Sequence, residues 1–213
     1  MTSSKRTLFY IHDPMCSWCW GFRPVWEQLK LQLDNSLDII YVVGGLAAES
    51  DQPMPETLQQ NLAATWHHIE QQIPNTQFNH KFWHPASNTQ PRRSTYPACR
   101  AVLAAKIQDP QAEDRMILGI QQAYYLNAKN PSNIDVLTEI AKHIGLNQEQ
   151  FQQDINSQAL EKEFKQQLKL ARQLSVQGVP SLVLSIDDDL HSIALDYNNS
   201  HTMQQSIVNI IGP

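Results

Sequence analysis

Positive charge is scarce in this chain of 213 residues, which carries 16 Lys and Arg against 21 Asp and Glu and has a formal net charge of -5. Nucleic acids and anionic membrane surfaces are bound by clusters of basic residues, and the sequence contains no such cluster. Long apolar runs are missing too, because no stretch approaches the roughly 18 residues that a membrane-spanning helix needs. We therefore expect neither a nucleic acid nor a membrane among the partners of this protein.

The amino-terminal segment lacks the pattern of an export signal. Residues 1–5 are polar, and the apolar run that follows them is shorter than the roughly 7 to 15 residues of a secretory signal. We therefore expect a cytoplasmic protein. A chain in which 41% of the residues are hydrophobic can bury one sizeable core and hold a smaller unit inserted into it.

Cysteine is also scarce, with three in the whole chain. Structural disulfides are rare in a reducing cytoplasm, so two cysteines close together in sequence indicate catalysis or metal binding. A structural zinc site uses about four ligands. The sequence has no second CxxC, and its other candidate ligands are scattered histidines, namely His67, His68, His80 and His84. A single CxxC after a strand is typical of a redox site, and we expect no bound metal.

The close pair lies in the motif Cys16-Ser17-Trp18-Cys19, between an apolar run that predicts a strand and an amphipathic run that predicts a helix. A thiol at the start of a helix meets unpaired backbone N–H groups and the positive end of the helix dipole, which favour the thiolate. Cys19 lies on the same helical face, close enough for the two sulfurs to form a disulfide. The motif therefore predicts thiol–disulfide exchange, with Cys16 as the candidate nucleophile.

Hydrophobic periodicity predicts an α/β fold that is interrupted by helices. A strand over residues 7–11, a helix over 20–34 and a strand over 37–43 form a βαβ unit that ends at a glycine pair, and from about residue 53 to 173 the pattern is helical. Strands return at residues 181–186 and 191–195, separated by an aspartate-rich turn, and a helix over 202–211 closes the chain. The expected inner helices are 55–72, 97–108, 111–127, 134–145, 148–156 and 160–174, with Ser132 or Asn133 and Asn147 as caps.

A second informative segment, Gly178-Val179-Pro180, precedes the returning strand. Proline lacks the N–H that a central strand needs, so it belongs at the first residue of the strand or in a tight turn, and the Xaa-Pro bond is the one in which cis is common. Because this segment occurs together with the CxxC motif, we expect Pro180 to be a cis-proline that brings the backbone of Val179 close to Cys16. A short open edge would remain there for an extended peptide.

The segment from Asp13 to Phe22, followed by a helical insertion and then by Gly-Val-Pro and a β-hairpin, resembles the DsbA-like branch of the thioredoxin superfamily. Within that branch it is similar to cytoplasmic members described as predicted protein-disulfide isomerases, with FrnE-like proteins as relatives. The resemblance implies a thioredoxin-like domain formed by residues 1–50 and 160–213 and a helical insertion domain of residues 51–159. It further implies that Cys16 is the exposed attacking thiol, Cys19 the buried resolving thiol and Pro180 the cis-proline.

The expected function is that of a thiol-disulfide oxidoreductase or protein disulfide isomerase. Val179 and Pro180, with Ser17 and Trp18 between the two cysteines, are the candidate substrate-binding residues. The periplasmic oxidants carry Pro-His at the positions of Ser17 and Trp18, and a cation there would stabilise the thiolate and raise the reduction potential. We therefore expect a reductase or isomerase that acts on disulfide-containing proteins or small thiols. Its electrons would come from glutathione or a thioredoxin-type system, and no resident cofactor is expected.

Several further residues allow two interpretations. His12 and Asp13 precede the CxxC and could tune Cys16 or carry a proton to Cys19, or they could be solvated at a strand end. Cys99 is expected to be a small buried core residue, with a third thiol in the redox relay as the alternative. Trp18 and Trp20 are expected to divide between the site and the core. The face Trp66-His67-His68 of a predicted helix is expected to be half-buried rather than to bind a ligand. The pair Arg92-Arg93 is expected to be solvated, and a clamp for a glutathione carboxylate is the alternative. The turn Asp187-Asp188-Asp189 is expected to be solvated.

Two other functions use the same sequence features. Glutathione-dependent isomerases and transferases of the kappa or hydroxychromene-carboxylate type belong to the same superfamily, but they typically have a serine where this chain has Cys16. A non-catalytic peptide-binding module, with unused thiols, is the other alternative. The intact CxxC favours the oxidoreductase over both.

Overall fold

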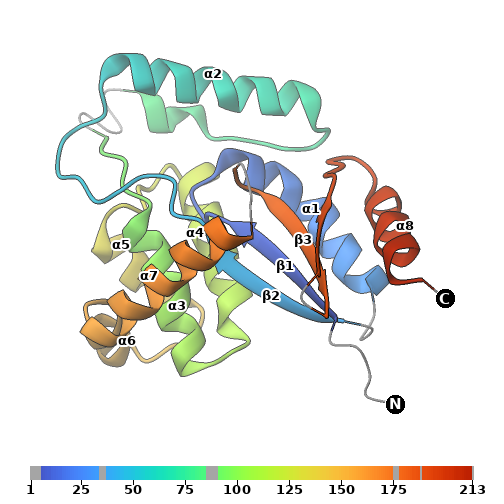
Figure 1. The fold of residues 1–213 in the computed structure, drawn as a ribbon. Helices are drawn as coiled ribbons and strands as arrows, with labels where there is room; N and C mark the ends of the chain where they lie inside the picture. Colours follow the sequence, from blue (N-terminus) through green and yellow to red (C-terminus); the bar gives the residue numbers. More distant parts are fainter. Residues whose placement is uncertain (1–5, 34–36, 85–90, 175–177, 188, 213) are drawn as a thin grey trace.

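The computed structural model describes residues 6–33, 37–84, 91–174, 178–187 and 189–212 (Figure 1). Its elements in chain order are β1 (Arg6–His12), α1 (Ser17–Leu33), β2 (Asp38–Val43), α2 (Glu56–Gln72), the 3-10 helix η1 (His80–Trp83), α3 (Tyr96–Gln108), α4 (Ala112–Tyr125), α5 (Ile134–His143), α6 (Gln148–Ile155), α7 (Gln158–Gln173), β3 (Ser181–Ile186), β4 (Asp189–Ile193) and α8 (Ser200–Ile211). Within the described residues, no helix has both the length and the apolar composition needed to cross a membrane.

The sheet has the strand order β2-β1-β3-β4, in which β1 and β2 are parallel and the other two pairs are antiparallel. Successive side chains of a strand point to opposite faces, and β1 follows this rule. Leu8 and Tyr10 pack in the cluster that includes residues of α1 and α8, whereas Ile11 packs with Ala171 and Leu174 at the carboxyl end of α7. The sheet is therefore the middle of three layers, with α1 and α8 together on one side of it (Figure 1). This is the expected α/β arrangement with a thioredoxin-like order of elements.

The helices α2 to α6 lie between β2 and α7 in the chain and supply most of a third hydrophobic cluster, which also includes Met15 and Val43. Trp66, Phe82 and Tyr125 are among its largest fully buried side chains. Helix α7 belongs to both parts of the molecule. Its first half contributes Leu160 and Phe164 to the core of the inserted helices, and its last half packs on the sheet. The predicted domain boundary near residue 160 falls at the start of this shared helix, and the division into two domains stays a prediction.

Charged side chains join the inserted helix α4 to α1. The Asp114 carboxylate accepts hydrogen bonds from Arg23 Nη2 at 3.0 and 3.1 Å and from Lys30 Nζ at 3.1 Å. The hydroxyl of Tyr41 on β2 donates to the same carboxylate at 3.4 Å. Burial opposes ionisation of Asp114, but Arg23 and Lys30 hold its pKa below the usual value. Helix α4 therefore docks on α1 through an ionised carboxylate.

The element bounds differ from the prediction at a few places. Helix α1 begins at Ser17 rather than near residue 20, because the Cys16 carbonyl accepts the first helical hydrogen bond, from Trp20 N at 3.1 Å. Strand β4 begins at Asp189, which pairs with Ile186, so the expected turn is shorter than three aspartates. Asp187 has a positive φ of 46°, and Asp188 lies outside the described residues.

The predicted helix caps gave mixed results. Asn147 caps α6 as expected, because its side chain accepts a hydrogen bond from Gln150 N. Asn133 occupies the capping position of α5, but its side chain accepts from Arg92 Nε at 3.3 Å and does not cap the helix. Competition from a long basic side chain cannot be read from the local sequence.

Candidate functional site

The register of the sheet brings three loops to one edge. In the parallel pair His12 lies opposite Val43, and in the antiparallel pair Ile11 lies opposite Ser181. The carboxyl ends of β1 and β2 and the amino end of β3 are therefore adjacent, and the loops that contain Cys16, Gly44 and Val179 meet there.

Cys16 lies at the start of α1, facing the loop that precedes β3. Its thiol donates to the carbonyl oxygen of Val179 at 3.5 Å, and its backbone N–H donates to the Asp13 carbonyl at 3.0 Å. The Val179–Pro180 peptide bond is cis. The residue is only 5% exposed, so the exposed thiol that the resemblance implied is instead nearly buried between the helix start and Val179.

Cys19 lies one turn further along α1 and has no exposed surface. Burial raises the pKa of its thiol well above the ordinary value, and the adjacent Cys16 thiol raises it further. Tyr10 is buried too, and burial raises the pKa of its hydroxyl group, with the neighbouring Cys19 raising it further. Both cysteines are free thiols here, and Cys19 is held in its protonated form.

Asp13 is fully buried and fastens the loop that carries the cysteines. Its Oδ1 accepts from Met15 N and its Oδ2 from Leu46 N, each at 2.8 Å. Burial raises the pKa of the carboxyl group, while these backbone donors and the Thr95 hydroxyl partly oppose the rise. The alternative of a solvated strand end is therefore wrong for Asp13, which links the CxxC loop to the loop after β2.

His12 is also buried, at 1% exposure, so a solvated position is wrong for this residue as well. Its ring stacks on Tyr10 with centroids 5.3 Å apart and meets the edge of Tyr41. Burial lowers the pKa of His12 to about 3, and neither ring nitrogen has a hydrogen-bond partner within the described part of the chain. The charged groups that act on it are Asp114, Arg23 and Lys106. His12 is thus a neutral core residue, and the sequence gives no sign of its burial because Tyr41 and α4 are distant in the chain.

Cys99, on α3, is fully buried, which confirms the expectation of a core position. Its thiol lies 3.7 Å from Asp13 Oδ2 and donates to that carboxylate. Burial raises the pKa of Cys99 well above the usual value, and the neighbouring Asp13 raises it further. The described contact of Cys99 is therefore with the carboxylate that holds the CxxC loop.

An open pocket of about 850 Å³ lies on the side of β3 and β4; Val179, which accepts the hydrogen bond from Cys16, lines it, but neither cysteine of the CxxC motif does. Trp18, Val179 and Pro180 line it, together with Tyr197, whose ring meets that of Trp18 edge-on at 5.3 Å between centroids. Ser17 is half-buried and is not among the residues that line the pocket.

The two tryptophans beside Cys19 are both half-buried and contact different parts of the molecule. Trp18 lines the pocket, whereas Trp20 stacks on Tyr125 and donates its indole N–H to the Gln77 carbonyl at 3.0 Å. Trp20 therefore ties α1 to the inserted helices.

Gly44, at the end of β2, belongs to the site although the sequence indicated only a strand end. Its N–H donates to the His12 carbonyl at 2.7 Å, and a Cβ added to it would lie 2.6 Å from Val179 Cγ1. The absence of a side chain at Gly44 thus allows the Val179 loop to lie close against β2. A glycine pair at the end of a strand can indicate such a close approach by another segment.

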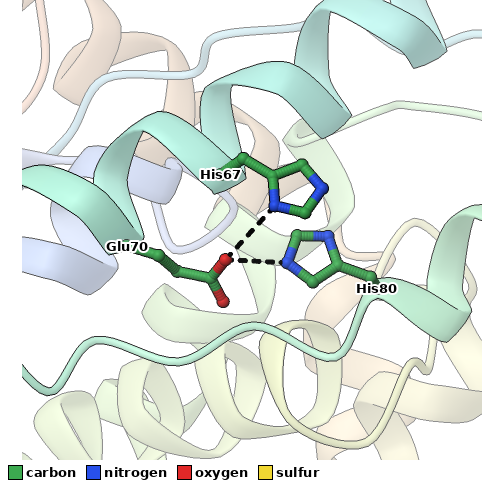
Figure 2. A group of neighbouring side chains, drawn as sticks. All are labelled: His67, Glu70 and His80. Atoms are coloured by element: carbon green, nitrogen blue, oxygen red, sulfur yellow. Dashed lines mark hydrogen bonds and ion pairs between the residues drawn. The ribbon is translucent and has the colours of Figure 1, made fainter.

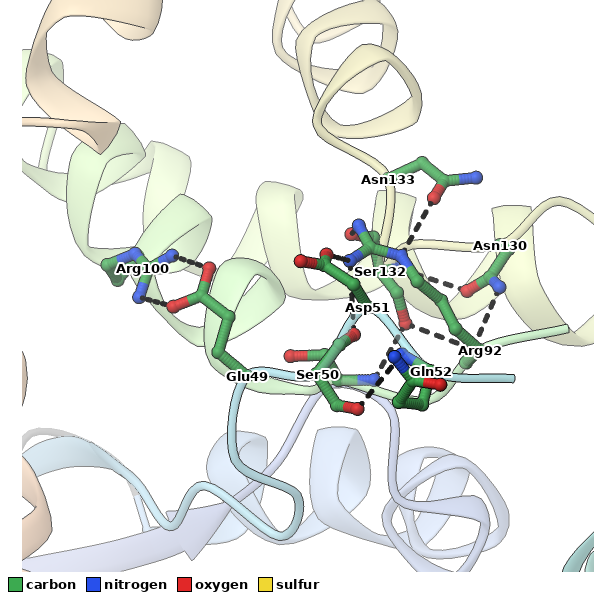
Figure 3. Close-up of polar contacts among 10 residues, drawn as sticks. Glu49, Ser50, Asp51, Gln52, Arg92, Arg100, Asn130, Ser132 and Asn133 are labelled. Carbon is green, nitrogen blue, oxygen red and sulfur yellow. Dashed lines mark hydrogen bonds and ion pairs between the residues drawn. The ribbon is translucent and has the colours of Figure 1, made fainter. Parts of the chain in front are cut away.

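The basic pair Arg92-Arg93 was expected to be solvated, and for Arg92 this is wrong (Figure 3). Its guanidinium donates to the carbonyl oxygens of Ser50 and Ser132 and to the Asp51 carboxylate. Arg92 therefore links the segment after β2 to the loop before α5. In the same region Arg100 binds the Glu49 carboxylate through two hydrogen bonds.

The expected half-buried face Trp66-His67-His68 divides between core and surface. Trp66 is fully buried and contacts Phe78 and Phe82, while His67 and His68 are exposed. The ring of His68 meets Trp18 edge-on at 5.9 Å between centroids.

The sequence profile of the thioredoxin family matches residues 9–205 of this chain. The matched segment includes both cysteines of the CxxC motif, Gly44 and the cis Val179–Pro180 bond.

Three solved structures share the fold. A protein proposed to be a disulfide isomerase, from Nitrosomonas europaea, aligns with a TM-score of 0.83 and 24% identity over 95% of this chain and 96% of that one. The cytosolic disulfide reductase DsbM from Pseudomonas aeruginosa aligns with a TM-score of 0.78 and 24% identity over 96% of this chain and 98% of that one. Its structure with GSH aligns at 0.76 and 22%, over 97% and 100% of the two chains.

Two curated relatives are described as the ClpXP adapter protein SpxH. The protein from Bacillus subtilis is 26% identical over 197 residues, and that from Halalkalibacterium halodurans is 25% identical over 184 residues. The matches cover 85% and 83% of this chain but only 64% and 57% of those proteins. The chain thus spans less than two thirds of the length of these relatives.

Proposed function

Because the chain belongs to the thioredoxin family, we propose that it is a thiol-disulfide oxidoreductase in which Cys16 attacks and Cys19 resolves. The observation that supports this assignment is the position of the Cys16 thiol, at the start of α1 and 3.5 Å from the Val179 carbonyl, at the edge of an open pocket. Cys19, buried beneath it, is protected from external disulfides but remains within reach of the Cys16 sulfur.

The reaction consists of two exchange steps. The Cys16 thiolate attacks one sulfur of a substrate disulfide, so the substrate S–S bond breaks, a mixed disulfide forms and one substrate thiolate leaves. Cys19 then loses its proton and attacks the Cys16 sulfur, which releases the second substrate thiol and leaves a Cys16–Cys19 disulfide. The substrate gains two electrons, and two molecules of a small thiol return the protein to the dithiol form.

The pocket beside Val179 offers both apolar and polar surface to an extended substrate. Trp18 and Tyr197 supply aromatic surface, while Val179 and Pro180 supply backbone beside the reacting sulfur. We propose disulfide-containing proteins or small disulfides as substrates and glutathione as the reductant. Glutathione is proposed because the DsbM structure that aligns with this chain was determined with GSH.

Cysteine substitutions test this proposal. Cys16→Ser is expected to reduce the rate of insulin-disulfide reduction to the uncatalysed level, because the attacking sulfur is lost. Cys19→Ser is expected to accumulate mixed disulfides with substrate, because the second exchange step cannot occur. Cys99→Ser is the matched control, since it removes a buried thiol that contacts Asp13, and it should keep turnover. Full turnover in Cys16→Ser would overturn the assignment.

A second candidate function is that of a ClpXP adapter, which is how the curated SpxH relatives are described. The pocket beside Trp18 would then be a docking surface, and the thiols would not need to react. Pull-down with the double variant Cys16→Ser, Cys19→Ser separates the two functions. An adapter would bind its partner unchanged in this variant, whereas an oxidoreductase would lose both its covalent partners and its turnover.

A further inference from the structure

A cluster of metal-binding side chains lies on α2 and the segment that follows it (Figure 2). His67 and Glu70 are one turn apart on the same face of α2, and His80 is the first residue of η1. Glu70 Oε2 lies 3.5 Å from His67 Nδ1 and 2.9 Å from His80 Nε2. Nothing in the proposed redox chemistry uses these three side chains.

Neighbouring groups hold the cluster in place. The other carboxylate oxygen, Glu70 Oε1, accepts a hydrogen bond from Phe78 N at 2.9 Å, which leaves Oε2 directed at the two imidazoles. Asn79, next to His80, donates its backbone N–H to the Tyr125 carbonyl at 2.6 Å and its side-chain amide to the Leu126 carbonyl at 2.9 Å. Such outer contacts orient the ligands of metal sites. His80 and Glu70 are therefore positioned by the fold and not only by each other.

The donor set is that of zinc. Two imidazole nitrogens and one carboxylate oxygen, with water at the open position, are a common ligand set for Zn²⁺. Among the residues that the structure describes, this is the group whose three potential ligand atoms converge, all within 4.8 Å of one another. Ligands at about 2.0–2.2 Å from a tetrahedral ion lie roughly 3.3–3.6 Å apart. The distance from His67 Nδ1 to Glu70 Oε2 already falls in this range.

The two imidazole rings stack face to face, with centroids 3.9 Å apart and an angle of 8° between their planes. An ion bound by both rings must lie near both ring planes, so binding requires one ring to tilt out of the stack. The His67 side chain is 62% exposed and can make this movement into solvent.

We propose that His67, Glu70 and His80 bind one zinc ion, with water completing its coordination. The ion would join α2 to η1 on the outer side of the inserted helices. The sequence alone predicted no metal, since the two histidines are separated by the whole turn after α2 and do not form a recognisable pair. The proposal is independent of the thiol chemistry.

Calorimetric titration with zinc chloride tests the site in the full chain without a polyhistidine tag. The parent for the test carries Cys16→Ser and Cys19→Ser, so that the thiols of the CxxC motif cannot bind the metal. We expect one equivalent of zinc to bind. Adding His67→Ala or Glu70→Gln should weaken binding by at least about tenfold. The matched control is His143→Ala, an exposed histidine on α5 outside the cluster, which should leave the affinity unchanged.

A thermal-unfolding measurement separates loss of the site from loss of the fold. Zinc should raise the Tm of the parent, because it binds the folded state, and should leave the Tm of His67→Ala unchanged. His67 is exposed, so the variant should unfold at the parent Tm when zinc is absent. The proposal is overturned if the parent binds no zinc, or if zinc binds and stabilises the parent and His67→Ala equally.

Discussion

At the scale of single residues, burial determines the role of each ionisable group around the site. Cys16 lies at a helix start with a carbonyl partner, Cys19 is kept protonated beneath it, and Cys99 contacts a buried carboxylate. The CxxC pair could be identified from the sequence because its spacing is local. The proximity of Tyr10 to Cys19 and the burial of His12 could not, since both arise where a strand packs against residues from other parts of the chain.

The buried His12 should make folding stability depend on pH. In the unfolded chain a histidine gains a proton below about pH 6.5, whereas burial lowers the pKa of His12 to about 3 in the folded protein. The unfolded state therefore binds more protons between these values, and the free energy of unfolding should fall as the pH decreases, by up to about 1.4 kcal/mol per pH unit.

Replacement of this residue tests that dependence. His12→Leu should remove this part of the pH slope in urea unfolding measured between pH 7 and pH 4. The exposed control His143→Leu should keep the slope of the natural chain. Equal slopes for His12→Leu and the natural chain would show that His12 is protonated when folded.

At the scale of elements, the site is a consequence of strand register. The ends of β1 and β2 and the start of β3 coincide, so the segments after residues 12 and 43 and before residue 181 must meet. Alternating and helical periodicities predicted all of these elements, and their bounds moved by only a few residues. The packing of Gly44 against Val179 could not be predicted, because it depends on the separation of two loops.

Substitution of Gly44 tests how closely Val179 must approach Cys16. In Gly44→Ala the new methyl group would lie 2.6 Å from Val179 Cγ1, so Val179 must shift away. Because misplacement of a group beside the reacting atoms is costly, we expect kcat/KM for disulfide reduction to fall roughly tenfold or more. Gly178→Ala is the matched control, since its added Cβ meets no described atom within 4 Å. Equal activity of both variants would mean that the loop contact does not position the site.

At the scale of the whole molecule, the contacts that join the sheet to the inserted helices include a shared helix and a cluster of charged side chains. Helix α7 contributes to both cores, and Asp114 binds Arg23 and Lys30 on α1. The sequence predicted the inserted helices in their correct order, because each has its own periodicity and end signals. How they dock could not be predicted, since it depends on charge pairs between helices far apart in the chain.

The docking contact predicts an acid-sensitive contribution to stability. The pKa of Asp114 is held below its usual 3.8, so its contribution is present above that pH and is lost as the pH falls through the lower folded value. Asp114→Asn should lower the free energy of unfolding by about 1 kcal/mol at pH 7, a small value because the group is partly solvated.

Chemical denaturation at a series of pH values measures this difference. The gap between the natural chain and Asp114→Asn should narrow as the pH falls below 3.8, because the carboxylate is then progressively protonated. A difference for Asp114→Asn that does not change with pH would contradict an ionic origin.

The central claim is that Cys16 and Cys19 form one reversible redox pair, and its most direct measurement is equilibration in glutathione buffers of graded ratio. The free thiols are then alkylated and the cysteines located by mass spectrometry. We predict a single two-electron transition in which Cys16 and Cys19 become linked to each other while Cys99 stays alkylatable after unfolding. A transition that leaves Cys16 and Cys19 both reduced, or that links either of them to Cys99, would contradict the account.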